Sequence, residues 1–108
     1  MAFKLNQSGK FTRPVTIEIA GDSGKWEKST VNATFAQPST EELDELKDIK
    51  PREVLERKLI GVTDLVDDDG NAVPFTPENK AALLSIPAAV AALSRTFWEN
   101  IVRTPTKN

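Results

Sequence analysis

The chain of 108 residues contains no cysteine and no histidine. The absence of cysteine excludes disulfides and thiolate metal sites, and the absence of histidine removes the commonest general base and metal ligand. A Ser-His-Asp catalytic site cannot be built within such a chain. No apolar run reaches the length of a membrane span, and the N-terminus lacks the layout of a signal peptide. We therefore expect a cytosolic protein that is not an enzyme and that binds no metal, cofactor or membrane.

The composition is that of a globular protein, with 39% hydrophobic and 28% charged residues. A chain of this length suffices for one domain with a modest core. The net charge is −2, so a basic surface for nucleic acid is not expected. We predict a single domain over residues 14–103, preceded by a flexible arm at 1–13 and followed by a flexible tail at 104–108.

Two segments, residues 15–20 and 30–36, alternate apolar and polar side chains with a period of two, which predicts strands. The expected inward residues are Val15, Ile17, Ile19, Val31, Ala33 and Phe35. Residues 21–25 (Gly-Asp-Ser-Gly-Lys) are typical of a hairpin loop. They do not match a phosphate-binding loop, because Ile19 takes the place of the first glycine and Trp26 follows the lysine. We predict an antiparallel hairpin whose apolar face is covered by a helix or by a partner.

The remainder predicts about four short α-helices, which makes the fold class α+β with an N-terminal antiparallel β-hairpin. The first helix has Ser39 or Thr40 as its N-cap, and Pro51 separates it from the second. A third helix runs from Pro77 to Ile86, and the last runs from residue 88 to about residue 103. The inward residues expected in the third helix are Ala82, Leu83 and Ile86.

The last helix contains the most prominent aromatic pair, Phe97 and Trp98. Adjacent side chains on a helix point about 100° apart, so both cannot lie at the centre of one narrow apolar stripe. The stripe favours the core for Phe97, whereas Trp98 fits the core edge and a partner surface equally well. Tryptophan is enriched at interfaces, so the candidate partner-binding residues are Trp98, Phe97, Val102 and Trp26.

Residues 67–77 (Asp-Asp-Asp-Gly-Asn-Ala-Val-Pro-Phe-Thr-Pro) combine a turn, an extended arm and a helix start. Val73 and Phe75 are the apolar anchors of the arm, and Thr76 is a good N-cap. The acidic turn is not a calcium loop, because Leu65 and Thr76 would stand at ligand positions one and twelve. A solvated turn is the expected structure.

Residues 69–79 and the sequence Leu-Leu-Ser-Ile-Pro at 83–87 resemble the tail assembly chaperones of long-tailed, siphovirus-type bacteriophages and prophages. The resemblance covers roughly residues 55–103. The preceding aliphatic run, 59–66, also matches in position, although Val62 stands where the family has tryptophan. Periodicity cannot distinguish helix from strand over residues 60–66. The resemblance favours a helix that continues from Pro51 and then bends toward the acidic turn.

The resemblance implies a chaperone that acts in the host cell cytoplasm and is absent from the mature virion. Such proteins coat the tape measure protein, keep it soluble and recruit tail tube subunits. The alternatives are a virion structural protein of the tail tube or head–tail junction, and a small non-enzymatic regulatory binding protein. The one-sided hairpin and the alanine-rich last helix also predict self-association, as open chains or spirals.

The resemblance further implies that a second, longer product can arise by a ribosomal frameshift near the end of the short form. Residues 106–108 (Thr-Lys-Asn) can be encoded by a run that contains the slippery sequence A-AAA-AAC. The alternative is an ordinary polar chain end after Pro105.

Overall fold

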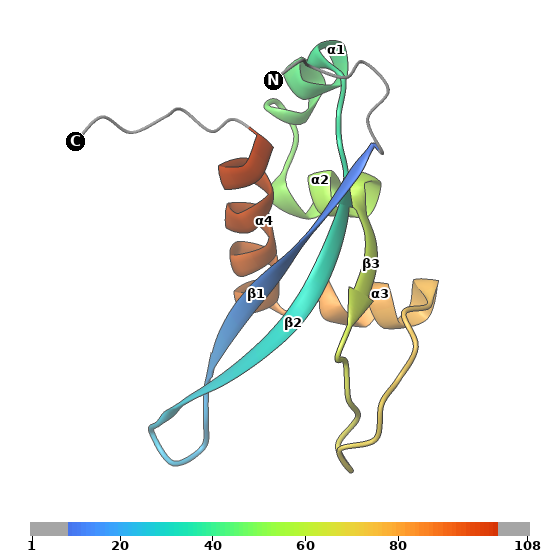
Figure 1. The fold of residues 1–108 in the computed structure, drawn as a ribbon. Coiled ribbons are helices and arrows are strands. Elements are labelled where there is room, and N and C mark those ends of the chain that lie inside the picture. The colour runs from blue at the N-terminus through green and yellow to red at the C-terminus, as the bar shows by residue number, and fades with distance from the viewer. Residues whose placement is uncertain (1–8, 102–108) are drawn as a thin grey trace, which may run out of the picture.

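The structure is a computed structural model that describes residues 9–101. It confirms the α+β fold class, and the N-terminal hairpin is followed by helices as expected (Figure 1). The strands are β1 (Lys10–Ala20), β2 (Trp26–Ala36) and β3 (Leu59–Thr63). The helices of the described part are α1 (Thr40–Leu46), α2 (Pro51–Lys58), α3 (Pro77–Leu83) and α4 (Pro87–Ile101).

The predicted hairpin is confirmed, with β1 and β2 paired antiparallel from Lys10 opposite Ala36 to Ala20 opposite Trp26. The turn closes where the Gly21 N–H donates to the Lys25 carbonyl at 2.7 Å. Gly24 has a φ of +82°, a conformation that suits glycine at this point of a short hairpin loop.

The N-terminal boundary of the domain differs from the prediction, because residues 10–13 belong to β1 and not to a flexible arm. The reason is that Phe11 stacks on Phe35 of β2, with ring centroids 5.3 Å apart. The remaining residues of the expected arm, 1–8, and the expected tail at 104–108 lie outside the described residues.

The expectation of a helix over residues 60–66 is wrong, since β3 adds a third strand to the sheet in the order β1-β2-β3. Leu59 and Val62 are buried, lying opposite Phe35 and Ala33 of β2. The register shifts between these pairs, and Ile60 is the extra residue, 49% exposed. A helix here would leave the second edge of β2 unpaired, so pairing outweighs the helical continuation.

One face of the sheet forms the core, and α4 packs against it alongside α2 (Figure 1). Phe11, Phe35 and Phe97 form an aromatic cluster, with centroid separations of 5.3–6.3 Å. The buried apolar residues are Val15, Ile17, Val31, Ala33, Phe35, Leu46, Val54, Leu55, Leu59, Val62, Leu83, Leu84, Ala89, Leu93 and Phe97. Ile19, expected inward, is 43% exposed, because the hairpin extends beyond the helices that cover the sheet (Figure 1).

The helix starts follow the sequence signals. The Ser39 Oγ accepts a hydrogen bond from the Glu42 N–H, and the Thr76 Oγ1 accepts one from the Asn79 N–H, both at 3.1 Å. Pro51, Pro77 and Pro87 each open a helix, where a missing N–H costs nothing.

The third helix ends at Leu83, three residues before the predicted end. The following residues form tighter turns, with the Ser85 N–H bonded to the Ala82 carbonyl and the Ile86 N–H to the Leu83 carbonyl. This change of geometry buries Leu84 and exposes Ala82 and Ile86, so the predicted inward positions of the latter two are wrong.

Candidate partner-binding surfaces

Trp98 lies at the edge of the core and lines an open groove of about 490 Å³. Its ring stands edge-on against Phe97, with centroids 5.3 Å apart, and it is partly buried. We name this the Trp98 groove; the other lining residues are Leu46, Lys47, Ile49, Pro51 and Val54. Trp98 therefore lies at the core edge, which was one of its two expected positions, and a role in partner binding stays a prediction.

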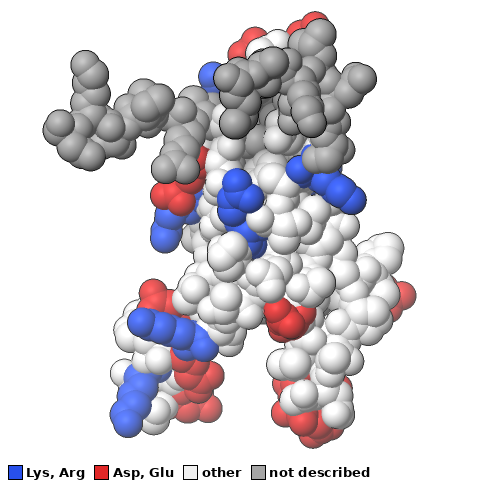
Figure 2. All heavy atoms as spheres, viewed as in Figure 1, with Lys and Arg blue, Asp and Glu red and all other residues white. Residues whose placement is uncertain are grey.

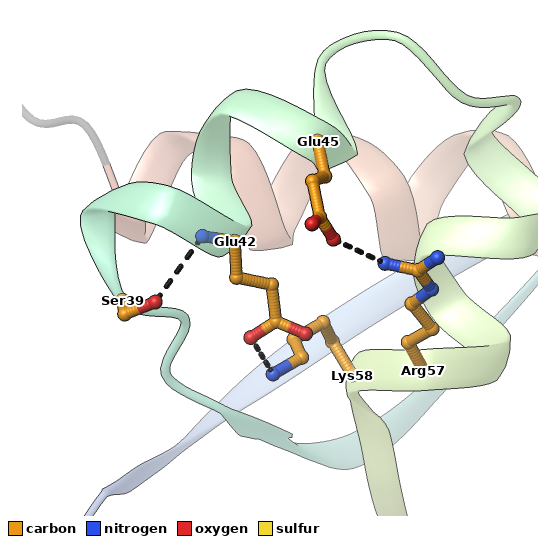
Figure 3. A network of polar contacts seen from close by, with 5 residues as sticks. All are labelled: Ser39, Glu42, Glu45, Arg57 and Lys58. Atoms are coloured by element: carbon orange, nitrogen blue, oxygen red, sulfur yellow. Dashed lines mark hydrogen bonds and ion pairs between the residues drawn. The ribbon is translucent and has the colours of Figure 1, made fainter.

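A network of polar contacts joins α1 to α2, two helices that contribute residues to this groove (Figure 3). The Lys58 Nζ of α2 donates to the Glu42 Oε1 of α1 at 2.5 Å, and the Lys58 side chain is largely buried. A second bridge joins Arg57 to Glu45 at 3.3 Å, between side chains that are about half exposed. Both bridges join α1, which ends at Leu46, to α2, and so they fasten together the two ends of the connection that contains Ile49.

The four predicted partner-binding residues do not form one site. Phe97 has no exposed surface, so it cannot contact a partner in this conformation and its assignment is corrected to the core. The reason is that Phe97 lies between the sheet and Trp98. Trp26 is 68% exposed at the turn end of the hairpin and lines no part of the Trp98 groove. Val102 lies outside the described residues.

Two arms project from the same end of the molecule (Figures 1 and 2). One is the turn end of the hairpin. The other, which we name the acidic arm, spans residues 64–73 and is closed by a bridge between Val66 and Ala72. The Val73 N–H donates to the Leu65 carbonyl at 3.0 Å, so the arm is a short antiparallel loop.

The tip of the acidic arm is organised by one carboxylate. The Asp67 Oδ1 accepts the backbone N–H groups of Asp69 and Asn71, both at 2.9 Å. The side chains of Asp68 and Asp69 make no hydrogen bond or ion pair with the described part of the chain, and both are exposed. Figure 2 shows the resulting acidic end of the arm. The predicted solvated turn is thus the observed structure of this segment.

A second groove, of about 190 Å³, lies where the acidic arm meets α3; we name it the arm groove. It is lined by Leu65, Val66, Val73, Asn79, Ala82, Leu83 and Ile86. Val66 is 61% exposed and Ile86 is 37% exposed. Sequence reasoning missed this groove because it placed Ala82 and Ile86 in the core. The signal for it was the presence of more apolar positions on α3 than one helix face can bury.

Burial lowers the pKa of the Lys80 ammonium, and the nearby Glu56 carboxylate partly opposes this effect. The Lys80 Nζ donates to the Glu56 carbonyl oxygen at 2.8 Å. Within residues 9–101, no three Asp or Glu side chains lie close enough together to hold a metal ion. The two grooves have largely apolar linings, which suit the binding of another chain.

Comparison of the chain with protein-family models, with curated proteins and with solved structures gives no match. In the described part of the chain, no single helix is long and apolar enough to cross a membrane. Within the same residues, α3 and α4 taken together have the length and the apolar composition for this, but the two helices are bent by 99° at their junction.

Proposed function

We propose that this protein is a tail assembly chaperone of a siphovirus-type bacteriophage or prophage. In this role it binds the tape measure protein in the host cell cytoplasm, keeps it soluble and recruits tail tube subunits. It is not an enzyme, uses no cofactor and is absent from the finished virion.

One observation carries the proposal: the residues that resemble the tail assembly chaperones, 69–87, form one continuous structural unit. The acidic turn, the extended stretch through Val73 and Phe75, and the Thr76-capped α3 follow one another as a single unit. Leu83 and Leu84 anchor the unit in the core, and Pro87 then begins α4. The family-like residues thus build the acidic arm, α3 and the arm groove, a surface that projects from the body.

The physical demands of the role are compatible with two apolar grooves. A long helical tape measure protein exposes apolar stripes that must be covered until the tube forms around it. A small domain covers such a stripe by accepting apolar side chains into concave surfaces. The Trp98 groove and the arm groove are the candidate surfaces for this, because each has a largely apolar lining.

The test is co-expression with the tape measure protein encoded nearby in the same genome. We expect the tape measure protein to stay in the soluble fraction only when this chain is present. An unrelated helical protein of low solubility serves as the control. A tape measure protein that is equally soluble alone, or insoluble in both cases, contradicts the proposal. Recovery of this chain in purified tails would instead support the virion structural alternative.

Self-association is part of the proposed role, because many copies are needed to cover one long partner. We expect open chains or spirals whose mass grows with concentration, since contacts between unlike surfaces need not close. Analytical ultracentrifugation over about a hundredfold range of concentration measures this. A single monomeric species throughout the range removes self-association and leaves partner binding to be tested separately.

A further inference from the structure

The charge of the molecule is unevenly distributed around the arm groove. Residues 64–86 contain five acidic side chains, Asp64, Asp67, Asp68, Asp69 and Glu78, and one basic side chain, Lys80. Five minus one gives −4 for this segment, whereas the whole chain has a net charge of −2. The rest of the chain therefore carries +2. Lys80 is engaged by the Glu56 carbonyl, so it does not neutralise the tip of the arm.

The same segment leaves apolar side chains exposed to solvent. Val66 and Ile86 are well exposed, and Ala82 is exposed between them on the lining of the arm groove. The exposed carboxylates of Asp68 and Asp69 lie on the same arm. An apolar groove lined in part by an acidic arm favours an occupant that is apolar at its centre and basic at its flanks.

We propose that the arm groove docks an amphipathic α-helix whose apolar residues are flanked by lysine or arginine. The apolar side chains of the helix enter the groove between the acidic arm and α3, and the basic flanks meet the carboxylates of the arm. The inference rests on the proposed function, in which a tape measure protein supplies the helix. It adds which groove receives the helix and which charge pattern is selected.

A second copy of this chain fits the groove less well. The most exposed large hydrophobic residue among residues 9–101 is Trp26, at the turn end of the hairpin. Its surroundings have mixed charge, since Lys25 and Lys28 alternate with Asp22 and Glu27 and Lys28 pairs with Glu18 at 3.7 Å. These two lysines and three carboxylates sum to −1, so this surface is not attracted to an acidic arm, whereas a helix with basic flanks is.

The experiment measures binding of labelled designed helical peptides to the full chain by fluorescence anisotropy at low salt. Two peptides share one apolar pattern and differ only in having lysine or glutamate at the flanking positions. We expect the lysine-flanked peptide to bind at least about tenfold more tightly than the glutamate-flanked one, with affinity that falls as salt rises.

Two matched substitutions on α3 locate the binding site. Ala82→Lys introduces a charge into the arm groove, and Ala81→Lys introduces the same charge on a neighbouring exposed position outside that groove. Lysine is a good helix former, so both variants should fold, and circular dichroism melts verify this. We expect Ala82→Lys to weaken binding by about tenfold or more and Ala81→Lys to change it by less than about threefold.

A second pair of variants tests the carboxylates of the acidic arm. The double variant Asp68→Asn with Asp69→Asn should weaken binding of the lysine-flanked peptide and flatten its salt dependence. Asp48→Asn, on the connection between α1 and α2, should change neither. Its exposed carboxylate lies in the connection that borders the Trp98 groove, so it also reports on that alternative site.

Several outcomes would overturn the inference. These are equal effects of Ala81→Lys and Ala82→Lys, no preference between the peptides, or loss of binding with Asp48→Asn alone. Loss of self-association in Ala82→Lys without loss of peptide binding would assign the groove to a second copy. If Ala82→Lys still keeps the tape measure protein soluble on co-expression, the inference fails while the proposed function stands.

Discussion

Two regions of the molecule differ in how far they bury their apolar side chains. One is the sheet with α2 and α4, which we name the packed end, and the other is the acidic arm with α3. At the packed end, Phe35 and Phe97 are fully buried and stack with a third ring. On the arm side, Val66 and Ile86 remain exposed along a groove. A side chain that is already buried in its own fold has no apolar surface to give to a partner. The packed end therefore buries the larger apolar side chains, whereas the acidic arm and α3 leave apolar surface exposed, as the Trp98 groove does in part.

The two regions also differ in how they treat charge. Lys58, in the packed end, is largely buried and reaches the Glu42 carboxylate. Lys80, on α3, reaches only a backbone carbonyl, and desolvation lowers its pKa.

Asp64 marks the border between the regions, with a φ of +70° where the chain leaves β3. This conformation costs about 1–2 kcal/mol in a residue with a side chain, and the Asn32 amide holds the Asp64 carboxylate at 3.1 Å.

The largest expected effect is that of Phe97→Ala in the packed end. Removing a fully buried ring leaves a cavity next to Phe11, Phe35 and Trp98, and we expect a loss of about 3–5 kcal/mol in the free energy of unfolding. Urea denaturation followed by tryptophan fluorescence measures it. Phe97→Leu, which keeps most of the volume, is the control and should cost much less. Equal losses for the two variants would show that the cavity is not the cause.

Glu42→Gln tests whether the buried lysine depends on its partner. The variant leaves the Lys58 ammonium largely buried without a carboxylate, and we expect a loss of about 1–3 kcal/mol. The double variant with Lys58→Met removes the charge as well and should recover most of the loss. Thermal melts at neutral pH compare the single and double variants. If the double variant is as unstable as the single one, the lost interaction is packing and not charge.

Much of the fold could be predicted from local signals that act alone. Alternation predicted the inward faces of β1 and β2 except at Ile19, and the helix starts followed from Ser39, Thr76 and three prolines. The state of β3 could not be predicted, because a continuous aliphatic run has no period and its pairing depends on the free edge of β2. The arm groove was missed for a similar reason. Whether Ala82 and Ile86 face inward depends on where α3 ends, and tertiary packing determines that end.

Phe75→Ala makes the same substitution on the arm side and sharpens the contrast with Phe97. Phe75 is only partly buried against the core, so its ring gives less than full burial. A fully buried ring would cost about 3–5 kcal/mol of the free energy of unfolding, so for Phe75→Ala we expect about 1–2 kcal/mol. The same urea denaturation measures both variants. A loss equal to that of Phe97→Ala would break the comparison, because the arm would then be as tightly packed as the core.

The smallest expected effect is a pH dependence that arises from Lys80. Desolvation, opposed by Glu56, lowers the pKa of Lys80 in the folded protein below the ordinary value of 10.5. Below the folded pKa the ammonium is charged in both states, and its burial destabilises the fold. As pH rises through the folded pKa toward 10.5, the folded protein loses this proton first, and the destabilisation disappears. The free energy of unfolding should thus rise with pH in the wild type relative to Lys80→Gln within this window.

Urea denaturation of both proteins across alkaline pH measures the difference, with Lys47→Gln, an exposed lysine beside the Trp98 groove, as the control. If the free energies of unfolding of wild type and Lys80→Gln differ by the same amount at every pH, Lys80 is as accessible to solvent as Lys47. Of the two lysines compared above, Lys58 and Lys80, only Lys58 would then be affected by burial.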